Sequence, residues 1–318
     1  MYLTSFETPI LFLVFNRPEN TRLVLEAIKR VRPSKLFVAA DGPRSQYIED
    51  KEKCEEVRKI IHREVDWPCQ VETWFREENV GCGKAVGGAI SWFFQHVEMG
   101  IILEDDCLPE ASFFSYCEVL LKEYAREPKV LQISGTNHLL EDSAGRNGYY
   151  YSNVSSIWGW ATWRRAWQLF SVPKELDPNV VTSKYTNSHY AGALVRMIED
   201  TQTGKIDTWD TYWAYTFCLH DGLAIVPFRN QIRNIGVLGT HEKQGTSRFL
   251  NMPTFSMEVA RLEKPEKMEV DVSVEQRAIR TIVKVDALKP SSWLAMVGKR
   301  IKACLSKIYS VALRTWRG

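Results

Sequence analysis

The residues of this sequence that point most directly to chemistry are three consecutive acids, Glu104, Asp105 and Asp106. They follow the apolar run 99–103, which is too short for a core helix and is typical of a buried strand. Ligands bind at the carboxyl ends of strands in open α/β sheets. Three adjacent anions repel one another, so the triplet needs solvent, a basic partner or a metal ion. A divalent cation with oxygen ligands meets that need, and a solvated acidic turn at a helix start is the alternative.

Two further candidate side chains stand where other predicted strands end. Arg17 follows the apolar run 10–15, and Asp41 follows a second predicted strand, 35–40. The next predicted elements are a helix over 45–64, a strand over 71–75 and a helix reaching about residue 97. This alternation predicts an α/β fold with a mostly parallel central sheet flanked by helices, as in Rossmann-like proteins. Right-handed crossovers would place Arg17, Asp41 and the acidic triplet at one edge of that sheet.

The alternation ends after about residue 130, where aromatic and polar residues mix without a clear period. We therefore expect a mixed second half that adds strands, loops and helices to the same domain.

Composition describes a globular chain that can bury a large core, with 318 residues of which 45% are hydrophobic. The formal net charge of +2 gives no support for nucleic-acid binding. Seven scattered cysteines without a CxxC pair indicate a reducing compartment and no zinc ribbon. The N-terminus has no basic segment before its short apolar run, so we expect a cytoplasmic protein without a signal peptide.

The segment 79–84, Asn-Val-Gly-Cys-Gly-Lys, superficially resembles a phosphate-binding loop. It lacks the spacing and the terminal Ser or Thr of a Walker motif. Gly81 and Gly83 instead predict a tight entry into the next helix, whose first N–H groups would face a bound donor. Lys84 is either a phosphate ligand or a solvated helix residue.

Eleven tryptophans are many for this length, and several of them cluster. Trp158, Gly159 and Trp160 combine two rings that can stack with a glycine that lets the backbone approach a ligand. This combination suits the wall of a site for sugar rings or bases. The alternative is a helix start at which Trp163 and Trp167 face the core.

The chain end from residue 291 contains basic residues and no acid. Trp293, Ile301 and Trp316 belong to an apolar helical stripe, with Lys299 and Lys302 among the residues opposite it. This pattern predicts an amphipathic helix at an anionic membrane surface. The alternative is a C-terminal helix that docks on its own domain.

Six short motifs occur in order over about residues 8–245. They are Val-Phe-Asn-Arg-Pro at 14–18, Ala-Asp-Gly-Pro-Arg at 40–44, Glu-Asn-Val-Gly at 78–81, Leu-Glu-Asp-Asp at 103–106, Trp-Gly-Trp-Ala-Thr-Trp-Arg-Arg at 158–165 and Thr-Trp-Asp at 208–210. In this order and spacing, the motifs resemble nucleotide-sugar glycosyltransferases of the glycosyltransferase A fold, in particular bacterial relatives of N-acetylglucosaminyltransferase I.

The resemblance implies a site built around the acidic triplet. Asp106 would hold a divalent metal ion, Mn²⁺ or Mg²⁺, that bridges the donor diphosphate, while Glu104 and Asp105 face the ribose and the base. Such an ion stabilises the charge of a departing nucleoside diphosphate as a Lewis acid. Arg17 and Asp41 would contact the nucleotide, against the alternatives of a surface ion pair for Arg17 and simple turn chemistry for Asp41.

The resemblance also implies a cleft wall and a base. Residues 158–160 would lie along the donor sugar and the acceptor. Transfer to a hydroxyl group needs a base, and Asp207 and Asp210 are the carboxylates available in their segment; the resemblance selects Asp210. Asp207 or Thr208 would cap the following helix. His241 would contact the metal or the diphosphate, or would simply be exposed.

We therefore expect a metal-dependent, inverting glycosyltransferase that uses a nucleotide-diphosphate sugar, preferably a UDP-sugar, and a glycan or lipid-linked acceptor. Residues 1–130 would bind the donor, and residues 131–270 of the same domain would bind the acceptor and carry catalysis. Residues 271–318 would form an extension at the inner face of the membrane.

Two alternatives from other classes remain. A sugar-nucleotide nucleotidyltransferase would carry a Gly-rich basic loop after its first strand, where this chain has the residues 16–18, Asn-Arg-Pro. A non-catalytic glycan-binding protein would explain the tryptophans but would not need the acidic triplet.

Overall fold

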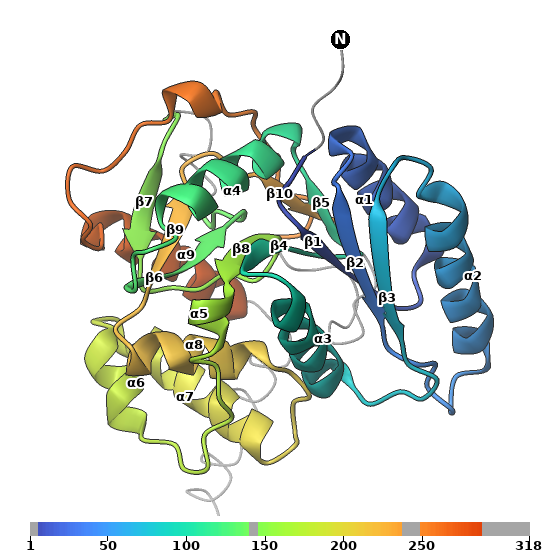
Figure 1. Ribbon diagram of the computed structural model, residues 1–318. Coiled ribbons are helices and arrows are strands. Elements are labelled where there is room, and N and C mark those ends of the chain that lie inside the picture. Colours follow the sequence, from blue (N-terminus) through green and yellow to red (C-terminus); the bar gives the residue numbers. More distant parts are fainter. Residues whose placement is uncertain (1–5, 140–145, 237–248, 288–318) are drawn as a thin grey trace, which may run out of the picture.

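The computed structural model describes residues 6–139, 146–236 and 249–287, and one mixed eight-stranded sheet organises them (Figure 1). The strand order is β3-β2-β1-β4-β8-β6-β9-β7. The strands are β1 (Ile10–Val14), β2 (Lys35–Ala40), β3 (Gln70–Phe75), β4 (Met99–Glu104), β6 (Val130–Ser134), β7 (Tyr149–Ser152), β8 (Trp160–Trp163) and β9 (Leu223–Pro227). A separate two-stranded sheet pairs β5 (Cys107–Pro109) with β10 (Ile232–Asn234).

The first four strands are parallel, as the alternation of strand and helix predicts. All five residues of β1 are buried, which explains its uninterrupted apolar sequence. The connecting helices are α1 (Pro18–Val31), α2 (Ile48–Glu64) and α3 (Cys82–His96). Because β2 and β3 lie on one side of β1 and β4 on the other, right-handed crossovers put α3 on the opposite face from α1 and α2. Ligands bind in the crevice at such a reversal of strand order.

The second half is mixed, as predicted. β8 is antiparallel to both β4 and β6, whereas β6 and β9 are parallel. Its helices are α4 (Ala111–Glu123), α5 (Arg164–Trp167), α6 (Pro178–Lys184), α7 (Ser188–Gln202), α8 (Asp210–Leu219) and α9 (Val272–Ala287), with the 3₁₀-helix η1 (Val259–Arg261). One sheet runs through both halves, so the expected α/β fold with a mostly parallel central sheet flanked by helices is confirmed. The division of roles at residue 130 stays a prediction.

Much of the tryptophan content lies in an aromatic cluster inside the protein. Trp160 stacks on Trp209 with ring centroids 5.7 Å apart, and both contact Trp167. Trp167 also stacks on Phe170 at 4.4 Å and contacts Trp213. Burial of these rings provides core stability, and it removes them from the surface that could stack against a ligand.

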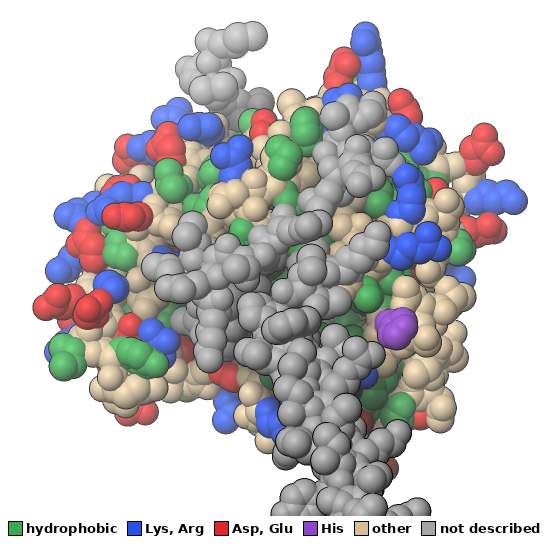
Figure 2. Space-filling view, turned by 180° about the vertical axis from the view of Figure 1, so that it is seen from behind, with side chains coloured by type: hydrophobic (Ala, Val, Ile, Leu, Met, Phe, Trp, Pro, Cys, Tyr) green, Lys and Arg blue, Asp and Glu red, His purple; other side chains and the backbone are tan. Residues whose placement is uncertain are grey.

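Two of the sequence predictions concern residues outside the described ranges. They are His241 and the basic stripe that begins at residue 291. Within the described part, no helix is both long and apolar enough to cross a bilayer. Figure 2 shows acidic and basic side chains interspersed over the described surface of one face of the molecule.

Candidate active site

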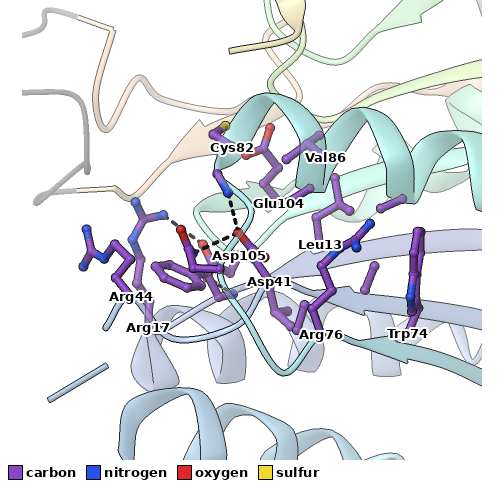
Figure 3. Close-up of a pocket in the computed structure, with 18 of the residues that line it drawn as sticks. Leu13, Arg17, Asp41, Arg44, Trp74, Arg76, Cys82, Val86, Glu104 and Asp105 are labelled. Carbon is purple, nitrogen blue, oxygen red and sulfur yellow. Dashed lines mark hydrogen bonds and ion pairs between the residues drawn. The ribbon is translucent and has the colours of Figure 1, made fainter. Parts of the chain in front are cut away.

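A cleft of about 240 Å³ opens at the sheet edge where β1, β2 and β4 end and α3 begins (Figure 3). It lies at the predicted edge of the sheet, and the strand order reverses there. Its lining residues include Arg17, Asp41, Arg44, Trp74, Arg76, Cys82, Ala85, Glu104, Asp105 and Asp207. Apolar side chains of β1, β2 and α3 form most of the rest of the lining, together with Asn79 and Gly81.

The acidic triplet has a basic partner. Nη1 of Arg17 donates to Oδ1 of Asp105 and to Oδ2 of Asp106, at 2.9 Å in each case. Asp105 also accepts a hydrogen bond from the backbone N–H of Phe15, at 3.2 Å. Burial and repulsion from its acidic neighbours raise the pKa of Glu104, and burial raises the pKa of Asp105, while Arg17 opposes both shifts. Of the three ways to tolerate the triplet, Arg17 provides the basic partner.

Asp41 holds a neighbouring loop in place. Its carboxylate accepts hydrogen bonds from the side chain of Asn79 at 2.9 Å and from the backbone N–H groups of Val80 and Gly81 at 3.1 Å each. Burial raises the pKa of Asp41, and these backbone donors oppose the rise. Asp41 lines the cleft as predicted, but both of its oxygens are engaged by residues 79–81, so contact with a nucleotide stays a prediction.

The start of α3 differs from the sequence prediction. The carboxylate of Asp207 accepts hydrogen bonds from the N–H groups of Cys82 at 2.7 Å and Gly83 at 3.0 Å. These two donors therefore face an internal carboxylate instead of a donor phosphate. Asp207 caps α3, and not the helix that follows it in the chain. Lys84 is exposed and does not line the cleft, which agrees with the solvated alternative.

Asp210 is the first residue of α8, and its carboxylate accepts a hydrogen bond from the hydroxyl of Thr208. It lies close enough to Glu104 for charge repulsion to contribute to the raised pKa of Glu104. The predicted base and the acidic triplet are thus neighbours in space.

The segment 158–160 is not an open wall. Trp160 is only 1% exposed, so its predicted role at the surface of the site is wrong. Gly159 has a φ of +59°, and a Cβ there would lie 2.3 Å from the side chain of Ile232, so close packing inside the protein explains this glycine. Trp158 is partly buried beside His138, 6.2 Å away between ring centroids. Trp163 is buried, as the core alternative predicted.

Sequence reasoning missed three side chains of the cleft wall, Trp74, Arg76 and Arg44. Arg76 lies over the ring of Trp74, with its guanidinium carbon 4.1 Å from the ring centroid, at the end of β3. The position of Trp74 and Arg76 in the sequence could have identified them, because the end of a third parallel strand must lie beside the ends of the first two. Arg44, part of the second motif, pairs with Asp50 at 2.6 Å and lies over Tyr47 at 4.1 Å.

The donor set suits a metal ion that arrives with its substrate. Among the described residues, no group of three His, Cys, Asp or Glu side chains is arranged to hold an ion. Asp106 offers a carboxylate whose side chain is 17% exposed. Mg²⁺ is commonly bound by one or two carboxylates together with substrate phosphates and water, and Asp106 fits that arrangement. His241 lies outside the described residues, so its predicted ligand role is untested.

Neither a protein-family model nor a curated protein matches this chain. Among solved structures, TarS 1–349 of S. aureus is 9% identical with a TM-score of 0.38, over 71% of this chain and 59% of the TarS chain. Mouse xyloside xylosyltransferase 1 is 11% identical with a TM-score of 0.36, over 68% and 83% of the two chains. A UDP-glucose pyrophosphorylase complexed with UDP-glucose is 12% identical with a TM-score of 0.37, over 72% and 94%. These likenesses are weak, and the α/β assignment rests on the sheet of this chain itself.

Proposed function

We propose that this chain is a metal-dependent glycosyltransferase that moves a sugar from a nucleotide diphosphate to a hydroxyl group with inversion at the anomeric carbon. One observation carries the proposal. Glu104 and Asp105 line a cleft at the switch point of the sheet, and Asp210 is close enough to Glu104 for their charges to interact. A diphosphate with its cation and a general base need such neighbouring carboxylates.

The inner part of the cleft suits a planar base. Ala39, Ala85 and Ala89 present small side chains between the sheet and α3, which leaves a slot with Trp74 at its side. The guanidinium groups of Arg76 and Arg44 line the same cleft and can donate to base carbonyls or phosphate oxygens. Uridine as the base rests on the family resemblance alone.

The reaction would proceed by direct displacement. The Asp210 carboxylate accepts the proton of the acceptor hydroxyl while that oxygen forms its bond to the anomeric carbon. The bond from this carbon to the diphosphate oxygen breaks, and the nucleoside diphosphate leaves with the electron pair. A divalent ion held by Asp106 and the diphosphate would supply Lewis-acid stabilisation of this charge. Arg17, 2.9 Å from Asp106, adds a positive charge at the same place.

The structure bears differently on the two alternatives. The tryptophans that would explain a glycan-binding protein are largely buried in the described part of the chain, so the buried rings cannot stack on a sugar. A nucleotidyltransferase would use a similar α/β cleft. However, α1 begins at Pro18, directly after Arg17, which is engaged by the triplet, so no glycine-rich basic loop follows β1.

The acceptor and the cellular location rest on sequence alone. A glycan, free or carried on a lipid, would suit the basic amphipathic stripe after residue 291, which would hold the enzyme at the inner face of the membrane. Vesicles with and without anionic lipid, in a sedimentation assay of the full chain and of a chain ending at residue 287, would test that part.

Calorimetry with UDP and Mn²⁺ tests the proposed function. We expect UDP to bind in the presence of Mn²⁺ and Asp106→Ala to abolish the metal-dependent part of this binding. Asp200→Asn is the matched control, because this partly exposed acid pairs with Lys205, at 2.7 Å, and does not line the cleft. If neither UDP nor any other nucleoside diphosphate binds with Mn²⁺ at millimolar concentration, the proposed function is wrong.

Turnover separates the base from the binding residues. Asp210→Asn should keep Mn²⁺-dependent UDP binding and lower UDP release from the active UDP-sugar by roughly 10²–10⁴-fold, because loss of a general base slows proton transfer. Unchanged UDP release by Asp210→Asn would exclude Asp210 as the base.

A further inference from the structure

Asp207 makes a contact that its local sequence does not require. It precedes α8, yet its two carboxylate oxygens accept from the N–H groups of Cys82 and Gly83 at the start of α3, at 2.7 and 3.0 Å. The first N–H groups of a helix have no partner within the helix, and its N-terminus carries partial positive charge. Gly81, the residue before α3, has no side chain that could serve these groups. Asp207 therefore acts as the cap of a helix more than a hundred residues away.

Gly81 and Gly83, the two glycines of the segment 79–84, leave room for the carboxylate of Asp207. A Cβ at Gly81 would lie 2.3 Å from Oδ2 of Asp207, and the φ of Gly81 is +87°. A Cβ at Gly83 would lie 2.9 Å from Oδ1 of Asp207 and 2.9 Å from the backbone oxygen of Thr208. Any larger residue at either position would push the segment away from α3. The glycines thus admit a carboxylate of the chain itself.

The contact lies next to Asp210. Only Thr208 and Trp209 separate Asp207 from Asp210, and the Thr208 hydroxyl donates to the Asp210 carboxylate. One turn along α3, Gly87 faces Trp209 at ordinary contact distance, with a Cβ there 3.8 Å from the Cβ of Trp209. The segment is therefore held against α3 at Asp207 and at Trp209, and α3 also forms one wall of the cleft.

We propose that Asp207 is a positioning residue, which fixes Asp210 relative to the donor cleft by clamping the start of α8 to the N-terminus of α3. The inference rests on the proposed function, in which Asp210 is the base. Both oxygens of Asp207 accept hydrogen bonds from backbone donors, which favours a holding role for Asp207 and leaves Asp210 as the base. Misplacement of a catalytic group by about 1 Å can cost up to about a hundredfold in rate, so the clamp has a measurable role.

The first test compares kinetic constants. Asp207→Ala and the milder Asp207→Asn should lower kcat for UDP release by about ten- to a hundredfold. The KM for the UDP-sugar and the Kd for UDP with Mn²⁺ should change little, because the donor contacts remain. Asp200→Asn is the matched acid-to-amide control and should change none of these constants. A kcat of Asp207→Ala equal to that of Asp200→Asn overturns the proposal.

A second pair of variants disturbs the same contact from the other side. Gly83→Ala places a methyl group against Asp207 and Thr208, and it should lower kcat as Asp207→Asn does. Gly87→Ala adds the same group one turn later, where there is room for it, and should leave kcat unchanged. Equal kcat values for the two glycine variants would contradict the clamp.

Amide hydrogen exchange tests the contact between Asp207 and α3 without an activity assay. Amides of residues 207–213 should exchange faster in Asp207→Ala and Gly83→Ala than in the wild type, Asp200→Asn or Gly87→Ala. Unchanged exchange over 207–213 would overturn the clamp even if turnover fell. If the wild type fails to bind UDP, the proposed function falls, and the exchange data still decide whether Asp207 holds this segment.

Discussion

Replacement of Arg17 by glutamine should destabilise the protein strongly in the absence of divalent cations and much less in their presence. Arg17 is the ion-pair partner of Asp105 and Asp106. The side chain of Asp105 is 5% exposed and that of Asp106 is 17% exposed, so water compensates their charges poorly once the guanidinium is removed. Burial already raises the pKa of Asp105, and Arg17 and the backbone N–H of Phe15 oppose that rise.

The size of the effect follows from this burial. Removal of one partner of a buried ion pair costs about 3–5 kcal/mol. The Arg17 side chain is 25% exposed, and protonation of one carboxyl would relieve part of the repulsion, so we expect a loss of about 2–3 kcal/mol in the free energy of unfolding. Arg22→Gln is the control, since its ion pairs with Glu56 and Glu64 are exposed and should contribute little.

Urea denaturation followed by tryptophan fluorescence measures this free energy, first with a chelator and then with Mn²⁺. A ligand of the folded state at a hundred times its Kd adds about 2.7 kcal/mol. Mn²⁺ should stabilise Arg17→Gln more than the wild type, because Arg17 and the ion compete for the same carboxylates. Equal stability of variant and wild type in chelator, or an equal response to Mn²⁺, would refute the role of Arg17 as the counter-charge of the triplet.

Three other perturbations have defined outcomes. Burial lowers the pKa of His138 from 6.5 to about 4, so the folded state holds it neutral: its contribution to stability is complete above about pH 6.5 and is lost as the pH falls towards 4. The free energy of unfolding should lose about 2–3 kcal/mol over that window in the wild type and less in His138→Gln, measured by urea titrations at several pH values. Gly100→Ala puts a Cβ 2.3 Å from the ring of Phe93 and 2.8 Å from the backbone oxygen of Pro9, so it should lower the free energy of unfolding by about 3 kcal/mol. Gly204→Ala, whose Cβ would have nothing within 4 Å, should lower it by only about 1 kcal/mol through backbone strain, in the same assay. Ala85→Leu fills the slot and should weaken UDP binding at least about tenfold by calorimetry, because the added atoms occupy the space of the base, whereas Ala111→Leu on an exposed helix start should have no effect.

Several features followed from the sequence alone. The continuous apolar runs of β1 and β2 located these strands, because a parallel strand covered on both faces is apolar at nearly every position. The acidic triplet at the end of β4 could be assigned to the ligand-binding edge, because ligands bind at the carboxyl ends of strands in open α/β sheets. These inferences use the local composition and the order of residues along the chain, which are the same in the folded and the unfolded protein.

Tertiary structure alone decided which charged groups meet. Arg17 binds the triplet, Asp41 binds the loop 79–81, and Asp207 binds the start of α3. Two of these contacts end on backbone N–H groups, which nearly every residue has, so no residue type in the sequence marks the partner. Packing likewise decided that Trp160 belongs to the core, although the residue types of the segment 158–160 suited a site wall. The physical reason is that burial and long-range hydrogen bonds depend on which distant segments come together in space. A local pattern of residue types does not show which segments these are.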